Sequence, residues 1–281
     1  PFTPMNGNGE LMCEVIPSYH DFLVKNKVVG AFINGSTGEG VSLSRKEKMQ
    51  NTDAWMAASK NGPIRIINLV GGTCYQESIE NAIHSKESGV YAISIVAPYY
   101  FKPAGAQQLA EFCARIAEAV PELPVYFYHI PVLSGCYVEM YDFLQKAAPM
   151  IPNLAGIKYT HEDFMDFLSC IHFMDGKYDM LWGRDENMLS ALILGTRAGV
   201  GSTYNYAAPL YYQMIEAFDN GNFPLARKLQ QRSIDMIRLL GKYGGISTGK
   251  MYLKYVGFDF GKFRLPVYNM DDELYDQFVE D

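Results

Sequence analysis

Asn153-Leu154-Ala155-Gly156-Ile157-Lys158-Tyr159-Thr160 is a short apolar run with proline before it and acidic residues after it. This pattern predicts a buried strand that ends close to Lys158. Because a buried ammonium group is costly, burial would lower the pKa of the lysine toward an uncharged, nucleophilic amine. A lysine that only reaches solvent from a strand end is the alternative interpretation.

Similar apolar runs lie on both sides of this strand, and each is followed by a helical pattern. The predicted strands cover residues 28–34, 64–70, 92–96, 125–128, 153–160, 179–182 and 198–201. Continuous apolar runs that alternate with helices indicate a parallel sheet covered by helices. Phe2-Thr3-Pro4, with no initiator methionine before it, is expected to end an eighth strand whose beginning is missing. Eight such units predict an α/β fold, a (β/α)8 TIM barrel.

The strand pattern stops near residue 210, and only helical patterns follow it. They cover residues 214–220, 223–242, 251–256 and 272–279. We therefore predict a barrel over residues 1–209, with its first strand truncated, and a C-terminal helical extension over residues 210–281 that packs on the barrel.

The composition excludes several classes of function. The chain has 281 residues and a net charge of −7, with no basic block, which argues against nucleic-acid binding. No run of about 18 apolar residues is present, so no membrane span is predicted. The five cysteines are scattered without CxxC spacing. This argues against a zinc site or a disulfide framework and predicts a reducing, cytoplasmic location.

Polar residues follow the predicted strands, at the end of the barrel where active sites of this fold lie. They are Ser36, Thr37, Tyr100, Tyr128, Lys158, Thr160, Gly183, Asp185, Glu186, Ser202 and Thr203. Taken singly, several have ordinary structural explanations. Ser36 and Thr37 could cap a helix, Tyr128 could be a core aromatic, and Asp185 and Glu186 could interact with a helix dipole.

Together these residues indicate chemistry on a 2-oxo acid. Lys158 is an amine able to form a Schiff base with a ketone, and Tyr128 could carry a proton near it. The loop of Ser36 and Thr37 offers backbone amides and hydroxyls to a carboxylate. No metal or organic cofactor is expected, because the lysine itself serves as the electron sink.

Two other classes of function fit these residues less well. A catalytically silent barrel that binds anionic sugars would need no amine at the end of that strand. A glycosidase using Asp185 and Glu186 is disfavoured, because adjacent residues on one loop do not readily flank a bond on opposite sides.

Four motifs in order resemble those of a known family. They are Gly35-Ser36-Thr37-Gly38-Glu39, Tyr128-His129-Ile130-Pro131, Gly156-Ile157-Lys158 and Gly201-Ser202-Thr203-Tyr204-Asn205. From Phe2 to about Tyr206 the chain resembles the pyruvate-dependent class I aldolases, the family of dihydrodipicolinate synthase and N-acetylneuraminate lyase. Leu133 stands where the synthases carry an arginine, so the resemblance is to the lyase branch.

The resemblance implies reversible cleavage of N-acetylneuraminate (sialic acid) to pyruvate and N-acetyl-D-mannosamine. Alternatives within the family are dihydrodipicolinate synthesis and aldol cleavage of a 2-keto-3-deoxy sugar acid. The family pattern implies catalytic roles for Lys158, Tyr128, Ser36 and Tyr100, with Tyr100 reaching into the neighbouring subunit of a homotetramer. It implies binding of the carboxylate by Ser36 and Thr37, and of the sugar hydroxyls by Thr160, Gly183, Asp185, Glu186 and Ser202. Arg184 and His129 depart from the usual pattern and are expected to tune specificity.

Overall fold

The structure is a computed structural model that describes residues 1–281. The chain forms two compact units. The first comprises residues 1–64, 185–189 and 201–281, and the second comprises residues 65–184 and 190–200.

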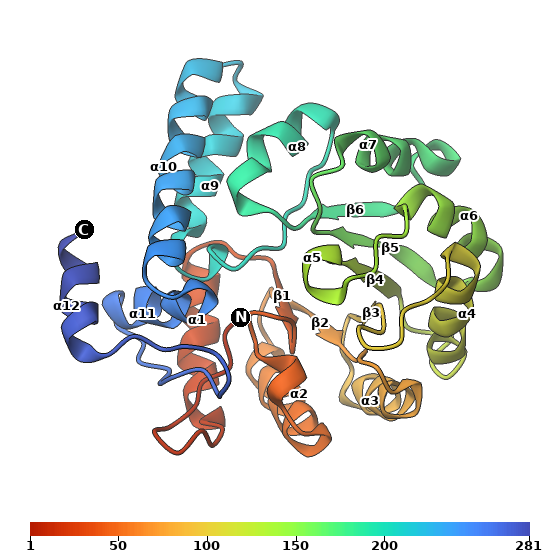
Figure 1. Cartoon of the computed structure of the whole chain (residues 1–281), viewed down its shortest axis with the longest axis horizontal. Coiled ribbons are helices and arrows are strands. Elements are labelled where there is room, and N and C mark those ends of the chain that lie inside the picture. Colours follow the sequence, from red (N-terminus) through yellow and green to blue (C-terminus); the bar gives the residue numbers. More distant parts are fainter. The chain divides into compact units, whose positions relative to one another are not determined.

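The second unit is built around a sheet of parallel strands. Neighbouring strands pair in sequence order, and Figure 1 shows them side by side with helices along them. The strands are β2 (Arg65–Leu69), β3 (Ala92–Val96), β4 (Val125–His129), β5 (Leu154–Tyr159) and β6 (Asp179–Trp182). The helices of this unit are α3 (Tyr75–Ser88), α4 (Ala106–Ala117), α5 (Pro131–Ser134), α6 (Met140–Met150) and α7 (Phe164–His172).

The apolar runs form strands because both faces of this sheet are covered. Every residue of β3 and of β4 is buried. The helix α4 contributes one apolar face, on which Leu109, Cys113 and Ile116 are buried at helical spacing. Strands enclosed on both sides lose the alternation of polar and apolar residues, as the sequence of these segments predicts.

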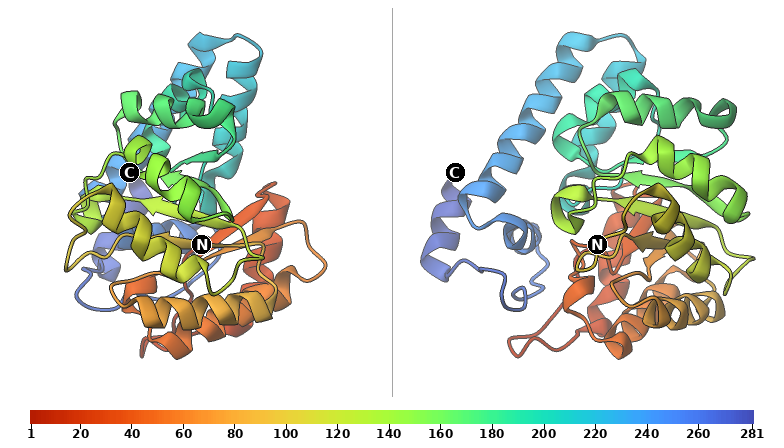
Figure 2. Two further views of the ribbon diagram at one scale, coloured as in Figure 1. Left: turned by 90° about the vertical axis from the view of Figure 1, so that its right-hand side faces the viewer. Right: turned by 45° about the vertical axis from the view of Figure 1, so that its right-hand side comes forward.

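The first unit holds one strand and most of the C-terminal helices. Its helices α9 and α10 lie side by side as an antiparallel pair joined by a short turn (Figure 2). The elements of this unit are β1 (Gly30–Ile33), α1 (Ile16–Lys25), α2 (Arg45–Ser59), α9 (Tyr204–Asp219), α10 (Phe223–Lys242), α11 (Thr248–Tyr255) and α12 (Asp272–Glu280). Phe278 of α12 is buried in a cluster with Tyr243 and Met270.

Two predicted strands are not formed as regular strands. In the segment 198–201, only Gly199 makes a bridge, to Trp182, although Trp182 N also donates to Ala198 O at 2.9 Å. The chain start makes an isolated antiparallel bridge between Met5 and Leu11. Pro4 has no N–H to donate, so a ladder cannot continue through it. The helix predicted after β6 is present as α8 (Met188–Leu194).

The predicted boundary at residue 209 falls inside a helix. Pro209 lies within α9, after a kink at Ala207, so the division into barrel and extension stays a prediction. No helix combines the length and the apolar character needed to cross a membrane. The five cysteines are free thiols, three of them buried.

Candidate active site

Lys158 lies near the end of β5 in the second unit and is only 7% exposed. The start of this strand is fixed, because the Asn153 side chain donates to the carbonyls of Val120 (3.1 Å) and Leu123 (2.8 Å). On the neighbouring strand β4, the residue in register with Lys158 is Tyr128. The buried lysine predicted from the sequence is therefore held by the register of two adjacent parallel strands.

Lys158 and Tyr128 are in direct contact. The Lys158 Nζ lies 3.9 Å from the centroid of the Tyr128 ring, and Tyr128 is 4% exposed. An ammonium group over the face of an aromatic ring is attracted by the ring quadrupole, more strongly where water is excluded. The contact places the amine near the end of the strand, next to a group that can carry a proton.

Thr160 and Gly183 lie together where β5 and β6 end. Gly183 N donates to Tyr159 O at 2.8 Å, and Thr160 N donates to His129 O at 2.8 Å. A side chain at Gly183 would place its Cβ 1.9 Å from Thr160 Oγ1, so only glycine fits. The Thr160 hydroxyl oxygen is buried and makes no hydrogen bond within the protein. An unsatisfied buried hydroxyl is costly, so Thr160 is poised to bind a polar group of a ligand.

Tyr100 differs from these residues in its exposure. It lies in the loop between β3 and α4, and 77% of its surface is exposed. Its ring packs edge-on against Phe101, which is 84% exposed. Two neighbouring aromatic side chains that face solvent are unusual on an isolated surface and common at interfaces between proteins.

Arg184 makes an ion pair that sequence reasoning missed. Its guanidinium Nη2 lies 2.9 Å from Glu162 Oε1, and its carbonyl accepts a 2.6 Å hydrogen bond from Trp182 Nε1. Glu162 follows β5 and Arg184 follows β6. The pairing depends on these strands being neighbours, so the sequence contains no local signal for it.

His129 is enclosed by aromatic rings at the end of β4. It is 3% exposed, and its ring centroid lies 5.0 Å from that of Tyr159 and 5.6 Å from that of His161. Burial, together with the charge of His161, lowers the pKa of His129 to about 3. His129 is therefore neutral in the folded protein at neutral and mildly acidic pH.

This neutral histidine makes a testable contribution to acid sensitivity. Below about pH 6.5 an unfolded chain protonates His129 while the folded chain does not, so stability falls as the pH drops toward 3. We expect His129→Gln to remove this part of the pH dependence, about 2 kcal/mol of unfolding free energy between pH 7 and pH 5. Urea unfolding at both values measures it. The exposed His172→Gln is the control, and equal pH slopes for wild type and His129→Gln would contradict the expectation.

In the first unit, Ser36 and Thr37 lie in a tight loop directly after β1. Glu39 N donates to Ser36 O at 3.1 Å, and the Thr3 hydroxyl donates to Gly38 O at 2.6 Å. The loop is also tied to α2, since the Asn51 amide donates to the Asn34 side chain at 2.8 Å. Ser36 and Thr37 themselves remain partly exposed. The loop is thus a rigid turn that presents a hydroxyl on each of two successive residues.

Asp185 joins two segments of the first unit. It is 4% exposed, and its Oδ2 accepts hydrogen bonds from Thr203 N (2.9 Å) and Thr203 Oγ1 (2.6 Å). The Thr203 hydroxyl also contacts Tyr211 OH at 2.6 Å, and Tyr211 OH contacts Ser233 Oγ at 2.7 Å. Asp185 therefore fixes the segment that contains Ser202 before α9 begins. This structural contact was not foreseen from the sequence.

The predicted site residues fall into two groups. Tyr100, Tyr128, Lys158, Thr160 and Gly183 belong to the second unit, and Ser36, Thr37, Asp185, Glu186 and Ser202 belong to the first. Within the second unit, the structure brings Lys158 to Tyr128 and Thr160 to Gly183. Within the first, Glu186 is beside Asp185 in a 3-10 helix, and Asp185 is tied to the segment of Ser202.

Comparison with known families accounts for the whole chain. The model of the Dihydrodipicolinate synthetase family matches residues 1–281. The chain belongs to this family. The family membership predicted from the four sequence motifs is confirmed.

Other proteins of the Dihydrodipicolinate synthetase family resemble the chain over nearly its full length. Human N-acetylneuraminate lyase is 38% identical over 280 residues, which are 98% of this chain and 87% of that protein. The structure of N-acetylneuraminate lyase from Proteus mirabilis superposes with a TM-score of 0.97 at 34% identity, covering 100% of this chain and 94% of that one. A dihydrodipicolinate synthase from Bacillus anthracis reaches 0.92 at 25% identity, with coverages of 100% and 94%. These matches confirm the predicted α/β TIM-barrel fold class.

Proposed function

We propose that this protein is a class I aldolase, a carbon–carbon lyase that reversibly cleaves N-acetylneuraminate to pyruvate and N-acetyl-D-mannosamine. The observation that carries the proposal is the buried Lys158 amine against the Tyr128 ring, 3.9 Å from its centroid, near the ends of two parallel strands. Relatives named N-acetylneuraminate lyase, in a vertebrate and in a bacterium, support this choice of substrate.

The reaction begins when the Lys158 amine attacks the ketone of the open-chain sugar. Loss of water gives an iminium, which draws electrons from the bond to be cleaved. The hydroxyl on the far carbon of that bond loses its proton through Tyr128, which relays the proton with the assistance of Ser36 and the substrate carboxylate. The bond breaks to leave an aldehyde and an enamine of pyruvate. Protonation of the enamine and addition of water release pyruvate and restore the amine. The lysine is the electron sink, so this chemistry requires no metal or organic cofactor.

The remaining roles concern binding of the substrate. Ser36 and Thr37 bind its carboxylate through backbone amides and hydroxyls, and Ser36 assists proton transfer by Tyr128. Thr160, Gly183, Asp185, Glu186 and Ser202 bind the hydroxyls of the sugar tail. The unpartnered buried hydroxyl of Thr160 supports its role. Asp185 would act in addition to its contact with Thr203.

We further propose that the protein is a homotetramer in the cytoplasm, with Tyr100 reaching into the site of a neighbouring subunit. The exposure of Tyr100 and Phe101 supports an interface at this loop. The free cysteines are in keeping with a reducing compartment. Light scattering on a gel-filtration column measures the mass in solution, and a monomer would contradict the tetramer.

The choice of aldehyde separates this function from those of other family members. Leu133 is 63% exposed on α5, and it has no charge with which to bind a second carboxylate. With pyruvate supplied, we expect condensation with N-acetylmannosamine at a rate at least about 100-fold above that with aspartate semialdehyde. Chromatography of the products measures both rates. Condensation with the semialdehyde alone would identify a synthase. A third assay supplies a 2-keto-3-deoxy sugar acid and measures its cleavage, which is the reaction of the other alternative in the family.

A further inference from the structure

Glu39 occupies an unusual backbone position in the loop that carries Ser36 and Thr37. Its φ is +57° and its ψ is +25°, in the left-handed region that residues with a side chain rarely adopt. The residue is 3% exposed. The next residue must be glycine, since a Cβ at Gly40 would lie 1.8 Å from Asn34 O. A charged, buried residue in this conformation needs specific partners to hold it.

Both carboxylate oxygens of Glu39 are engaged by the C-terminal part of the first unit. Lys250 Nζ of α11 lies 2.8 Å from Oε1, and the backbone N–H of Arg264 donates to Oε2 at 2.8 Å. Lys250 is fully buried, and it also donates to the carbonyl of Lys262 at 3.1 Å. Buried charges are retained where each is paired and hydrogen-bonded, as both are here.

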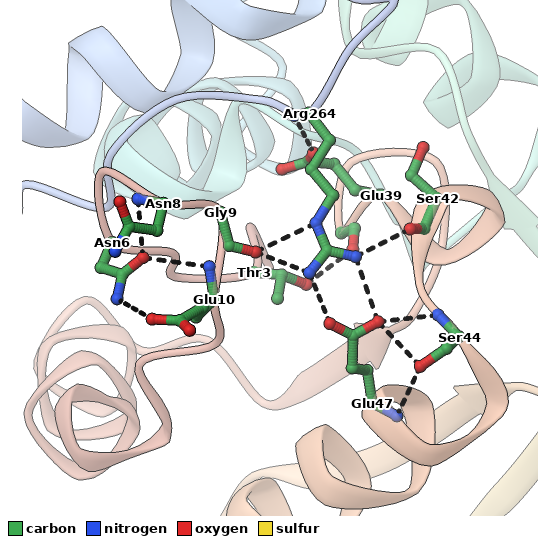
Figure 3. Close-up of polar contacts among 11 residues, drawn as sticks. Thr3, Asn6, Asn8, Gly9, Glu10, Glu39, Ser42, Ser44, Glu47 and Arg264 are labelled. Atoms are coloured by element: carbon green, nitrogen blue, oxygen red, sulfur yellow. Dashed lines mark hydrogen bonds and ion pairs between the residues drawn. The ribbon is translucent and has the colours of Figure 1, made fainter.

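The side chain of Arg264 ties the chain around this residue to three other residues of the first unit. Figure 3 shows its guanidinium between the carboxylate of Glu47 and the carbonyls of Gly9 and Ser42. The hydrogen bonds to Arg264 lower the pKa of Glu47 to about 2, so the pair is ionised at neutral pH. Glu47 also completes the N-terminal capping box of α2 with Ser44. The backbone N–H of Arg264 that binds Glu39 therefore belongs to a segment held in place by several contacts.

We infer that Glu39, Lys250 and Arg264 are positioning residues that give the loop its affinity for the carboxylate of pyruvate. Glu39 N donates to Ser36 O, and Gly40 N donates to Gly35 O, so the conformation at Glu39 determines how Ser36 and Thr37 are presented. The ion pair with Lys250 thus acts on the substrate through the loop and does not touch it. This inference rests on the proposed function, because it assigns the loop to the carboxylate.

The test uses the borohydride-trapped adduct on Lys158 as a measure of occupancy. It is titrated with pyruvate and, separately, with acetone, a ketone without a carboxylate. The variants are Lys250→Met and the double variant Glu39→Gln with Lys250→Met. The double variant removes both charges together, which leaves no unpaired buried ion if the single variant fails to fold. Lys262→Met is the control, an exposed lysine side chain in the same segment.

We expect the pyruvate concentration for half-maximal trapping to rise at least about 10-fold in the two variants, with the acetone titration unchanged, since only pyruvate uses the loop. The Lys262→Met protein should match wild type for both ketones. An unchanged pyruvate titration in the variants would overturn the inference, as would a parallel loss for pyruvate and acetone. Absence of any pyruvate adduct in wild type would instead overturn the proposed function, and the inference with it.

Discussion

Replacing Lys158 with methionine is expected to abolish the pyruvate adduct and to lower the rate of aldol cleavage by about 10⁴-fold or more. Methionine is unbranched and of similar length, so it fills the space beside Tyr128 without an amine. No other group in the proposed mechanism can form the iminium, and the loss should appear in kcat. Lys158 is only 7% exposed, and methionine keeps an apolar side chain of similar length in that buried space, so we expect the variant to fold.

The rate of N-acetylneuraminate cleavage, monitored through the pyruvate released, measures this effect. The matched control is Lys146→Met, which removes an exposed lysine from α6 of the same unit and should leave the rate unchanged. Urea unfolding of both variants checks that the fold is intact. If the folded Lys158→Met protein still cleaved the sugar within 10-fold of wild type, the Schiff-base mechanism would be wrong for this chain.

Replacing Tyr128 with phenylalanine is expected to lower kcat by about 10² to 10⁴-fold while leaving the lysine in place. Phenylalanine keeps the aromatic face on which Lys158 Nζ lies, and it removes only the hydroxyl. The variant should therefore still form the pyruvate adduct, although its turnover is slow. This combination separates proton transfer from positioning of the amine.

The control is Tyr126→Phe, on the same strand. The Tyr126 hydroxyl donates to Asp179 Oδ2 at 2.7 Å, so its removal changes stability and should spare kcat. Single-turnover trapping and steady-state cleavage are measured on both variants. A Tyr128→Phe enzyme with kcat within threefold of wild type would exclude this hydroxyl as the proton carrier.

The strands of the second unit could be predicted from the sequence almost residue by residue. The runs at residues 92–96 and 179–182 have the same bounds as β3 and β6. The run at residues 92–96 is almost entirely apolar because both of its faces are buried. The segment at residues 198–201 and the chain start are different, since isolated bridges replace ladders there. Apolar character alone does not distinguish these cases.

The candidate site was predicted where its signal is local and missed where it depends on packing. Lys158 and Tyr128 each lie at the end of an apolar run, so their places at the strand ends of the barrel could be inferred from the sequence alone. The partners of Glu39 could not, because Lys250 resembles an ordinary charged residue of an amphipathic helix although it is fully buried. The neutral state of His129 likewise arises from its enclosure by Tyr159 and His161, which lie at the end of a different strand.

The central claim is that Lys158 forms a Schiff base with pyruvate. The direct measurement mixes the wild-type protein with pyruvate, reduces it with borohydride and maps the modified peptide by mass spectrometry. We predict one reduced pyruvate per chain, on Lys158, with Lys250 and all other lysines unmodified. No adduct, or an adduct on a different lysine, would contradict the account.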